Sequence, residues 1–299
     1  MSGSVAPPGH SSRLNQPQQE HEEATVSALM STYAGETATN LKESLESIYA
    51  QTVPPDQLVL VLDGPVEVGQ EVVIARYVFD SRVANLTLVR LPSNGGLARA
   101  MNAGLERCSG KYIMRADSDD ICDPRRLELQ LDYFNAHPET DVVTGWCAEF
   151  YNDCRPERLK ASSVHHDAVA RALRWRNVLT HGTVLIRTEK LRGIGGYRPD
   201  FPMLEDYDLY VRLVLSGARF HVIPKVLYRM RTSVEQCRRR GGLRYCLNEL
   251  LFRFSCLRLG FLNTTEFFVI TLMYVVFRLI GGSIRNHLDA FARTPAVVE

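Results

Sequence analysis

The residues with the clearest potential for chemistry lie in the stretch Lys111–Leu127, which reads KYIMRADSDDICDPRRL. Asp117, Asp119 and Asp120 fall close together, directly after a short apolar run. Carboxylates this close repel one another unless a cation lies among them. Hard oxygen ligands suit Mg²⁺ or Mn²⁺, which proteins bind through one or two carboxylates plus substrate phosphates. The spacing therefore indicates a divalent-metal site, although Asp and Ser at these positions also fit a polar turn before a helix.

A second pair of carboxylates, Glu205 and Asp206, begins an apolar segment that predicts a largely buried helix over Leu204–Leu215. The positive end of the helix dipole favours their ionised forms. Acidic residues are common at helix N-termini, so Glu205 also fits a structural role. Asp206 follows a Gly-Gly-Tyr turn and would supply the general base that an aspartate metal cluster lacks. We expect Asp206 to be partly desolvated against Tyr207 and Tyr210, which would strengthen it as a base.

An alternating pattern of strands and helices would position these groups. The first half predicts strands at Val26–Thr32, Leu58–Leu62, Leu86–Leu91 and Lys111–Ala116. Helices are expected between them, at about Leu41–Tyr49, Val72–Phe79 and Leu97–Cys108, and from Pro124 onward. This alternation implies an α/β fold with a mostly parallel central sheet flanked by helices. Three strands end in polar groups that would meet at one edge, where such sheets bind ligands: Thr32 with Glu36, Asp63, and the aspartate cluster.

The second half of the chain is less regular. We expect strands at Asp141–Tyr151 and Val184–Arg187 and a helix at Ala168–Arg176, before the buried helix that begins with Glu205. The sequence has no G-x-G-x-x-G motif after its first strand and no G-x-x-x-x-G-K-[ST] motif, which argues against a dinucleotide-dependent dehydrogenase and a P-loop enzyme.

Composition narrows the class of protein further. The chain has 299 residues, 45% of them hydrophobic, and a formal net charge of +1, which argues against a nucleic-acid-binding protein. Its seven cysteines include no C-x-x-C pair, and no signal peptide opens the sequence, so a reduced, cytoplasmic setting is expected. We expect a disordered tail at 1–24, a catalytic domain at 25–232 with halves at 25–125 and 126–232, and a helical segment at 233–299.

The C-terminal segment interleaves arginines with leucines and phenylalanines, which predicts amphipathic helices. Its longest apolar run, Phe267–Phe277, is shorter than the ~20 residues needed to span a bilayer. Basic, aromatic-rich amphipathic helices are typical of proteins that lie on an anionic membrane surface. We therefore expect a peripheral location on the cytoplasmic face of the inner membrane. Packing on the catalytic domain or on a second copy is the alternative.

Five ordered motifs between Val26 and Arg231 resemble family 2 glycosyltransferases with the GT-A (nucleotide-diphospho-sugar transferase) fold. They read STYAGE, QTVPPDQLVLVLDGP, NGGLARAMNAGL, RADSDDICDPRRL and GGY…LEDYDLYVRL. Within the family the chain is most similar to the amylovoran-type exopolysaccharide and capsule enzymes of bacteria. The resemblance implies a metal-dependent enzyme that transfers a sugar, with inversion, from a nucleoside-diphosphate donor, expected to be UDP-linked. The acceptor would be a hydroxyl of a lipid-linked or oligosaccharide molecule in surface-polysaccharide assembly.

The resemblance also implies roles for particular residues. It assigns Asp117 and Asp119 to the metal and the diphosphate, with Asp119 the more direct ligand, and Asp206 to the catalytic base, with Glu205 beside it. The nucleotide-sugar would contact the residues Thr32, Tyr33, Glu36, Asp63, Arg99, Asp117 and Ser118. His181 and Tyr197 are candidates for the acceptor site. No third metal ligand is identified from the sequence.

One position departs from the family pattern. Leu62 stands where members often carry the first of two acids at the end of the second strand, which leaves recognition of the nucleotide base open.

The sequence leaves two alternative functions. A sugar-phosphate nucleotidyltransferase would need a Gly-rich, Arg-containing loop after the first strand, which Ser31–Glu36 does not supply. Against a catalytically silent sugar-nucleotide or membrane-binding protein stand the aspartate cluster and the Glu205–Asp206 pair.

Overall fold

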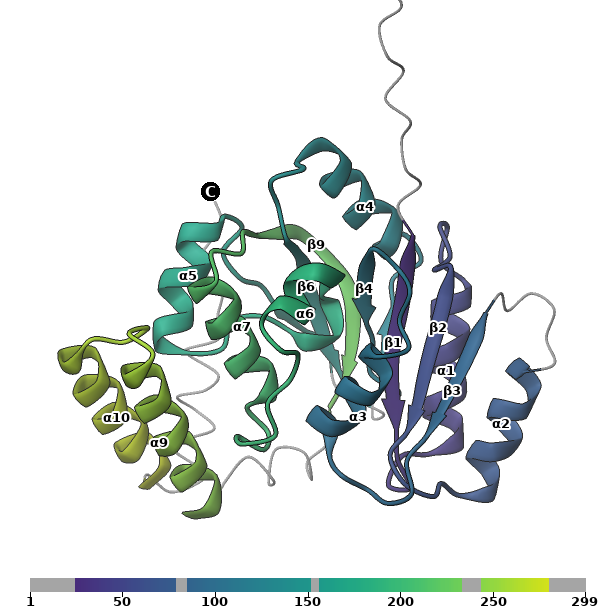
Figure 1. The fold of residues 1–299 in the computed structure, drawn as a ribbon, viewed down its shortest axis with the longest axis horizontal. Coiled ribbons are helices and arrows are strands. Elements are labelled where there is room, and N and C mark those ends of the chain that lie inside the picture. The colour runs from purple at the N-terminus through teal and green to yellow at the C-terminus, as the bar shows by residue number, and fades with distance from the viewer. Residues whose placement is uncertain (1–24, 79–84, 152–155, 233–242, 280–299) are drawn as a thin grey trace, which may run out of the picture.

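The fold is that of a computed structural model, which describes residues 25–78, 85–151, 156–232 and 243–279. The tail expected at residues 1–24 lies outside the described residues. All nine strands of the described chain belong to one sheet, in the order β3-β2-β1-β4-β8-β6-β9-β5, with β7 paired to β6. Helices cover both of its faces (Figure 1).

The first four strands of this sheet are parallel, as the alternating pattern predicts. They are β1 (Val26–Thr32), β2 (Gln57–Leu62), β3 (Leu86–Arg90) and β4 (Tyr112–Arg115). Thr32 pairs with Leu62, and Leu62 pairs with Arg90, so the carboxyl ends of β1, β2 and β3 lie level with one another. The residue after Leu62, Asp63, therefore stands beside the end of β1.

The second half of the sheet is mixed. It consists of β5 (Ile121–Cys122), β6 (Val142–Phe150), β7 (Arg158–Lys160), β8 (Leu185–Arg187) and β9 (Phe220–Arg231). β8 is antiparallel to both β4 and β6, whereas β6 and β9 are parallel. The sheet expected to be mostly parallel is thus parallel in its first half and mixed in its second half. An apolar run indicates a buried strand but carries no information about strand direction.

The helices follow the expected positions, with shifted ends, apart from the short helix Thr188–Gly193, which the sequence did not predict. The described ones are α1 (Ala38–Tyr49), α2 (Val68–Val78), α3 (Leu97–Leu105), α4 (Arg126–Ala136), α5 (His166–Trp175), α6 (Thr188–Gly193), α7 (Glu205–Leu215), α9 (Leu243–Arg258) and α10 (Thr264–Leu279), with a short 3₁₀ turn at His181–Thr183. α4 begins two residues after Pro124, because the carboxylate of Asp123 accepts the Arg125 N–H at 2.9 Å and keeps these residues in a turn.

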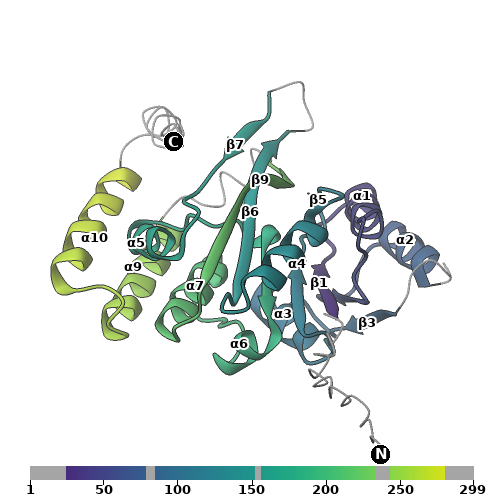
Figure 2. The same cartoon turned by 90° about the horizontal axis from the view of Figure 1, so that it is seen from above.

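Successive residues of a strand point to opposite faces of the sheet and are buried in two separate hydrophobic cores. On one face, Ala28 and Met30 of β1 pack with α1, α2 and α4. On the other face, Leu29 packs with α3, α6 and α7, and this second core continues into α5, α9 and α10 (Figures 1 and 2). This arrangement follows from the two-residue period of a strand whose two faces are both covered.

The C-terminal helices α9 and α10 form a hairpin that packs beside α5 and α7 (Figure 2). Phe252, Cys256 and Ile270 on the inner side of the hairpin are buried in the second core. Of the two expected arrangements, the structure therefore contains packing on the catalytic domain, and it leaves an outer face of the hairpin exposed. No helix within the described ranges combines the length and apolar character required to cross a membrane.

Candidate active site

Asp63 at the end of β2 organises the loop that begins α3. Its backbone N–H donates to the Thr32 carbonyl at 2.8 Å. Its carboxylate accepts the N–H groups of Gly95 and Gly96 at 2.7 and 2.9 Å. Gly96 has φ +84°, a conformation that favours glycine, so both residue types are needed for this loop. Asp63 therefore lies at the expected sheet edge and holds the loop that leads to Arg99; its contact with a nucleotide stays a prediction.

The turn after β1 is also ordered by a carboxylate. Glu36 accepts the Thr37 N–H at 2.6 Å and the side-chain amide of Asn40 at 2.8 Å. Thr37 in turn caps α1 by accepting the Asn40 N–H. Tyr33 is exposed beside this turn, and Arg99 is exposed on α3. These two side chains are therefore accessible to a ligand.

The three clustered aspartates have different surroundings. Asp120 is buried, and its carboxylate accepts the Arg231 N–H at 2.7 Å. Asp117 forms an ion pair with Arg115, which is only 2% exposed. Burial, together with the charges of Asp117 and Glu36, raises the pKa of Asp119 to about 7. Asp120 thus has a structural role, while Asp119 lies in a desolvated setting beside two other carboxylates.

The loop that carries Asp119 is fixed by a residue far along the chain. Arg231 donates through Nε to the Asp119 carbonyl at 2.8 Å and through Nη2 to Glu43 at 2.6 Å. Ser44 donates to the Asp117 carbonyl at 2.6 Å. Arg231 is not predictable as a site residue from the sequence, because nothing near it indicates that the end of β9 reaches this loop. Ser118, inside the loop, is buried.

The aspartates suit a divalent cation that also binds substrate oxygens. Asp117 and Asp119 offer hard oxygen ligands; the pKa of Asp119 is raised by burial and by repulsion from Asp117 and Glu36, and a cation would relieve the repulsion. In the described ranges no group of three or more His, Cys, Asp or Glu side chains forms a site that could hold a metal alone. Asp117 and Asp119 could therefore supply two carboxylates to Mg²⁺ or Mn²⁺, with the remaining ligands coming from a diphosphate.

His181 and Tyr197 are buried as a pair. The His181 Nε2 and the Tyr197 hydroxyl lie 2.9 Å apart. Burial and the charge of Arg115 hold the pKa of His181 well below its usual value, so the imidazole is neutral. Two hydrogen bonds of 2.8 Å join the backbone of Tyr197 to the side chain of Asn102 on α3. The structure thus brings both residues beside Arg115, and their role toward an acceptor stays a prediction.

Asp206 lies in the first turn of α7 and is partly buried, as expected. Its Oδ1 accepts the Tyr207 N–H at 2.8 Å and its Oδ2 accepts the side-chain amide of Asn177 at 2.7 Å. The neighbouring Glu205 has a raised pKa, mainly because of burial. Asn177 was not identified from the sequence: it lies in a short connection after α5, with no motif around it.

The charges of Asp206 and Asp117 both raise the pKa of two buried tyrosines, Tyr197 and Tyr210. Burial raises the pKa of Tyr210, and the charges of Asp206 and Asp117 raise it further. The pKa of Tyr197 is raised by burial, with contributions from the same two carboxylates. Because such effects need proximity, Asp117 and Asp206 lie around one group of side chains, although their elements, β4 and α7, are far apart in sequence.

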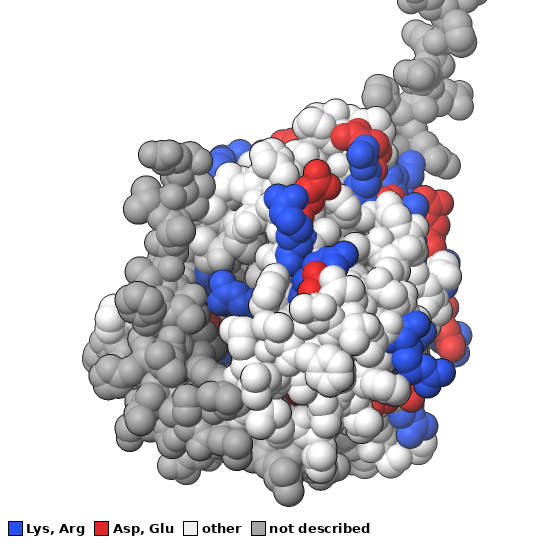
Figure 3. All heavy atoms as spheres, turned by 90° about the vertical axis from the view of Figure 1, so that its left-hand side faces the viewer, with Lys and Arg blue, Asp and Glu red and all other residues white. Residues whose placement is uncertain are grey.

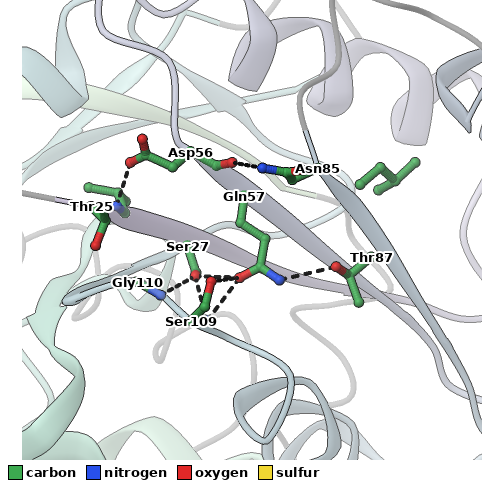
Figure 4. A pocket seen from close by; sticks show the side chains of 10 residues that line it. Thr25, Ser27, Asp56, Gln57, Asn85, Thr87, Ser109 and Gly110 are labelled. Carbon is green, nitrogen blue, oxygen red and sulfur yellow. Dashed lines mark hydrogen bonds between the residues drawn. The ribbon is translucent and has the colours of Figure 1, made fainter.

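A pocket of about 350 Å³ lies at the opposite edge of the sheet, where β1 and β2 begin. The polar groups that line it already bind one another (Figure 4). The Gln57 amide oxygen accepts the Ser27 hydroxyl at 2.6 Å, and its nitrogen donates to Thr87 at 3.0 Å. The Asp56 carboxylate accepts the Val26 N–H at 2.7 Å. None of the residues predicted for the active site lines this pocket. Its polar side chains already form hydrogen bonds with one another, which leaves few groups to bind a ligand.

Comparison with known families tests the class of protein. The model of the family described as Glycosyl transferase family 2 matches residues 27–194. The chain belongs to this family. It is 35% identical over 250 residues to an amylovoran biosynthesis glycosyltransferase, AmsE of Erwinia amylovora, covering 83% of this chain and 92% of the relative. It is 28% identical over 262 residues to the Escherichia coli UDP-Gal:alpha-D-GlcNAc-diphosphoundecaprenol beta-1,3-galactosyltransferase, covering 88% and 94% of the two chains.

Solved structures have the same fold. The structure of S. aureus TarS 1-349 in complex with UDP-GlcNAc matches with a TM-score of 0.64 at 18% identity, over 84% of this chain and 71% of that one. The mannosyltransferase PcManGT from Pyrobaculum calidifontis, in complex with GDP-Man and Mn²⁺, matches with a TM-score of 0.59 at 17% identity, over 89% and 79% of the two chains. The predicted α/β GT-A fold and the glycosyltransferase class are thus confirmed, and the chain is an enzyme of family 2.

Proposed function

We propose that this family 2 enzyme transfers a sugar from a nucleoside-diphosphate donor, expected to be UDP-linked, to a hydroxyl of a lipid-linked or oligosaccharide acceptor, with inversion, in bacterial surface-polysaccharide assembly. The observation that supports the proposal is that Asp117, which pairs with the buried Arg115, and Asp206, which Tyr207 and Asn177 hold, both lie near the buried side chains of Tyr197 and Tyr210. The carboxylates proposed for the metal and for the base would then line one site. The names of the two curated relatives support the pathway and the lipid-linked acceptor.

The residues would divide the chemistry as follows. Asp117 and Asp119 would hold Mg²⁺ or Mn²⁺ with the donor's diphosphate; when bound, the cation neutralises negative charge on the leaving group. Asp206 accepts the proton of the acceptor hydroxyl, whose oxygen forms a bond to the anomeric carbon. The bond from that carbon to the diphosphate oxygen breaks, and its electron pair leaves with the nucleoside diphosphate. Attack opposite the leaving group inverts the anomeric configuration.

A panel of nucleotide sugars tests this function. The full chain is incubated with each donor, with Mg²⁺, Mn²⁺ or a chelator, and release of the nucleoside diphosphate is measured with and without a diphospholipid-linked sugar acceptor. We expect metal-stimulated release that rises when the acceptor is added, and an inverted linkage by nuclear magnetic resonance. Formation of a nucleotide sugar from a sugar phosphate would instead identify a nucleotidyltransferase, and binding without turnover would identify a catalytically silent protein.

We further propose that the outer face of the α9–α10 hairpin lies on an anionic membrane surface on the cytoplasmic side of the inner membrane. Large apolar side chains at helical spacing are exposed there, namely Leu247, Leu250, Leu251 and Phe254 of α9 and Phe268, Val269, Leu272 and Met273 of α10. The side of the molecule that carries the hairpin has a broad area without charged side chains (Figure 3). Residues 233–299 contain nine arginines and five acidic residues, which favours anionic headgroups.

Vesicle co-sedimentation tests this surface. We expect the full chain to bind vesicles of phosphatidylglycerol and phosphatidylcholine better than vesicles of phosphatidylcholine alone. Leu251→Asp and Leu272→Asp should weaken binding, whereas Val72→Asp, a matched change at an exposed position on α2, should not. A chain that stays in the supernatant in every case refutes the membrane role, and a dimer that these two variants dissociate identifies a second copy as the occupant.

A further inference from the structure

The last turn of α5 is held by side chains from three other helices: Tyr207 of α7, Arg253 of α9 and Tyr274 of α10, whose hydroxyl donates to the Trp175 carbonyl at 3.3 Å. The carbonyls of Leu173, Arg174 and Trp175 are the last of this helix, and such carbonyls have no partner within the helix. The Tyr207 hydroxyl donates to the Leu173 carbonyl at 2.6 Å. Arg253 of α9 donates to the Arg174 carbonyl at 3.1 Å and to the Trp175 carbonyl at 3.2 Å. A cation at this end also matches the negative end of the helix dipole.

Arg253 is buried in an unusual manner for an arginine. It is 2% exposed, and its ion pair with the Glu249 carboxylate is long, at 3.5 Å. Its guanidinium also donates to the Tyr207 hydroxyl at 3.2 Å and lies over the rings of Tyr207 and Tyr274, 5.2 and 4.7 Å from their centroids. An apolar side chain of similar volume would fill this space without the cost of burying a charge. The contacts that distinguish Arg253 from such a side chain are its hydrogen bonds to the α5 carbonyls and to the Tyr207 hydroxyl.

These contacts lead to Asp206 by two short routes. Asn177 follows α5 by two residues; its amide nitrogen donates to Asp206 Oδ2 at 2.7 Å, and its oxygen accepts the Leu179 N–H at 3.1 Å. Tyr207, which Arg253 also binds, donates its backbone N–H to Asp206 Oδ1. Both donors to the Asp206 carboxylate are thus attached to groups that Arg253 holds.

We propose that Arg253 is a positioning residue for the Asp206 carboxylate, acting through the end of α5 and through Tyr207. The C-terminal hairpin is then part of the catalytic apparatus. This inference rests on the proposed role of Asp206 as the base. The guanidinium fixes the direction in which Asn177 leaves α5, and Asn177 fixes the rotamer of Asp206 against the acceptor hydroxyl.

Kinetic comparison of four variants tests the inference. We expect Arg253→Met to lower kcat by about 10- to 100-fold, because a misplaced catalytic group has effects of this size, while the affinity for the nucleoside diphosphate stays within about twofold. Arg253→Lys should recover part of kcat. Tyr207→Phe keeps the ring but loses both hydrogen bonds of the hydroxyl, to the Leu173 carbonyl and from Arg253, so a decrease of about three- to tenfold is expected. Arg171→Met, the matched change at an exposed position of α5, should match the wild type.

A second measurement does not depend on turnover. Hydrogen–deuterium exchange should become faster at residues 174–180 and 204–210 in Arg253→Met and Tyr207→Phe, and stay unchanged in Arg171→Met. The inference is overturned if Arg253→Met leaves kcat and exchange unchanged, or if kcat and nucleotide affinity fall together as in a general loss of folding. A wild-type chain that transfers no sugar would refute the proposed function alone, because the exchange measurement still tests the hold of Arg253 on the Asp206 turn.

Discussion

Replacing Asp206 by asparagine removes the proposed base with the smallest change of shape. The carboxylate accepts one hydrogen bond from the Tyr207 N–H and one from Asn177. An amide has a single acceptor oxygen, so its nitrogen would face one of these donors. The lost charge-assisted hydrogen bond corresponds to about 1.5–3 kcal/mol in a buried setting. Because Asp206 is only partly buried, we expect the free energy of unfolding to fall by about 1–2 kcal/mol, which leaves the protein folded.

The effect of Asp206→Asn on catalysis should be much larger than its effect on stability. Loss of a general base lowers the rate by about 10²- to 10⁴-fold, equivalent to about 3–5 kcal/mol in the activation barrier. Nucleotide affinity should stay within about twofold, because the residues expected to hold the donor follow β1, β2 and β4 or lie on α3, whereas Asp206 lies on α7. The assay is sugar transfer with the best donor of the panel, combined with calorimetric titration of its nucleoside diphosphate.

The matched control is Asp132→Asn, an exposed aspartate on α4, which should behave as the wild type. Transfer by Asp206→Asn at the wild-type rate would refute the assignment of the base. Parallel loss of transfer and nucleotide binding would show instead that Asp206 supports the fold of the site.

Three further outcomes are expected. Folding raises the pKa of Asp119 from 3.8 to about 7, so in the absence of metal the free energy of unfolding should fall by about 1.4 kcal/mol per pH unit as the pH rises between these values. Thermal melting in the presence of a chelator should detect this slope. The slope should be absent in Asp119→Asn and smaller when Mn²⁺ and a nucleoside diphosphate are added. Arg231→Met removes the hydrogen bonds to the Asp119 carbonyl and to Glu43, so calorimetry should find the metal-dependent nucleotide affinity about tenfold weaker. An unchanged affinity would show that the Asp119 loop keeps its conformation without Arg231. Gly182→Ala places a Cβ 2.3 Å from the Tyr228 ring and should lower the free energy of urea unfolding by about 1–3 kcal/mol, whereas Gly193→Ala meets nothing within 4 Å and should not.

The sequence by itself determined the first half of the fold. Continuous apolar runs such as Leu58–Leu62 indicated strands covered on both faces, and the helical patterns between them indicated that these strands are parallel. Since parallel strands end at one edge, this alternation also predicted that Thr32 and Asp63 would meet; they do, through the 2.8 Å hydrogen bond between their backbones. The aspartates after β4 were found because like charges at such short spacing are costly without a ligand.

Tertiary structure alone decided how these groups are held. Arg231 reaches the Asp119 loop from 112 residues away, and Asn177 reaches Asp206 from a connection without a motif. Local spacing carries no information about such contacts, because they depend on the direction and register of β8 and β9. The same is true of Arg253, whose amphipathic helix predicts a buried side but not that a guanidinium binds the last carbonyls of α5. Residue type and period thus determined which groups could react, whereas long-range packing decided which of them are brought together and fixed.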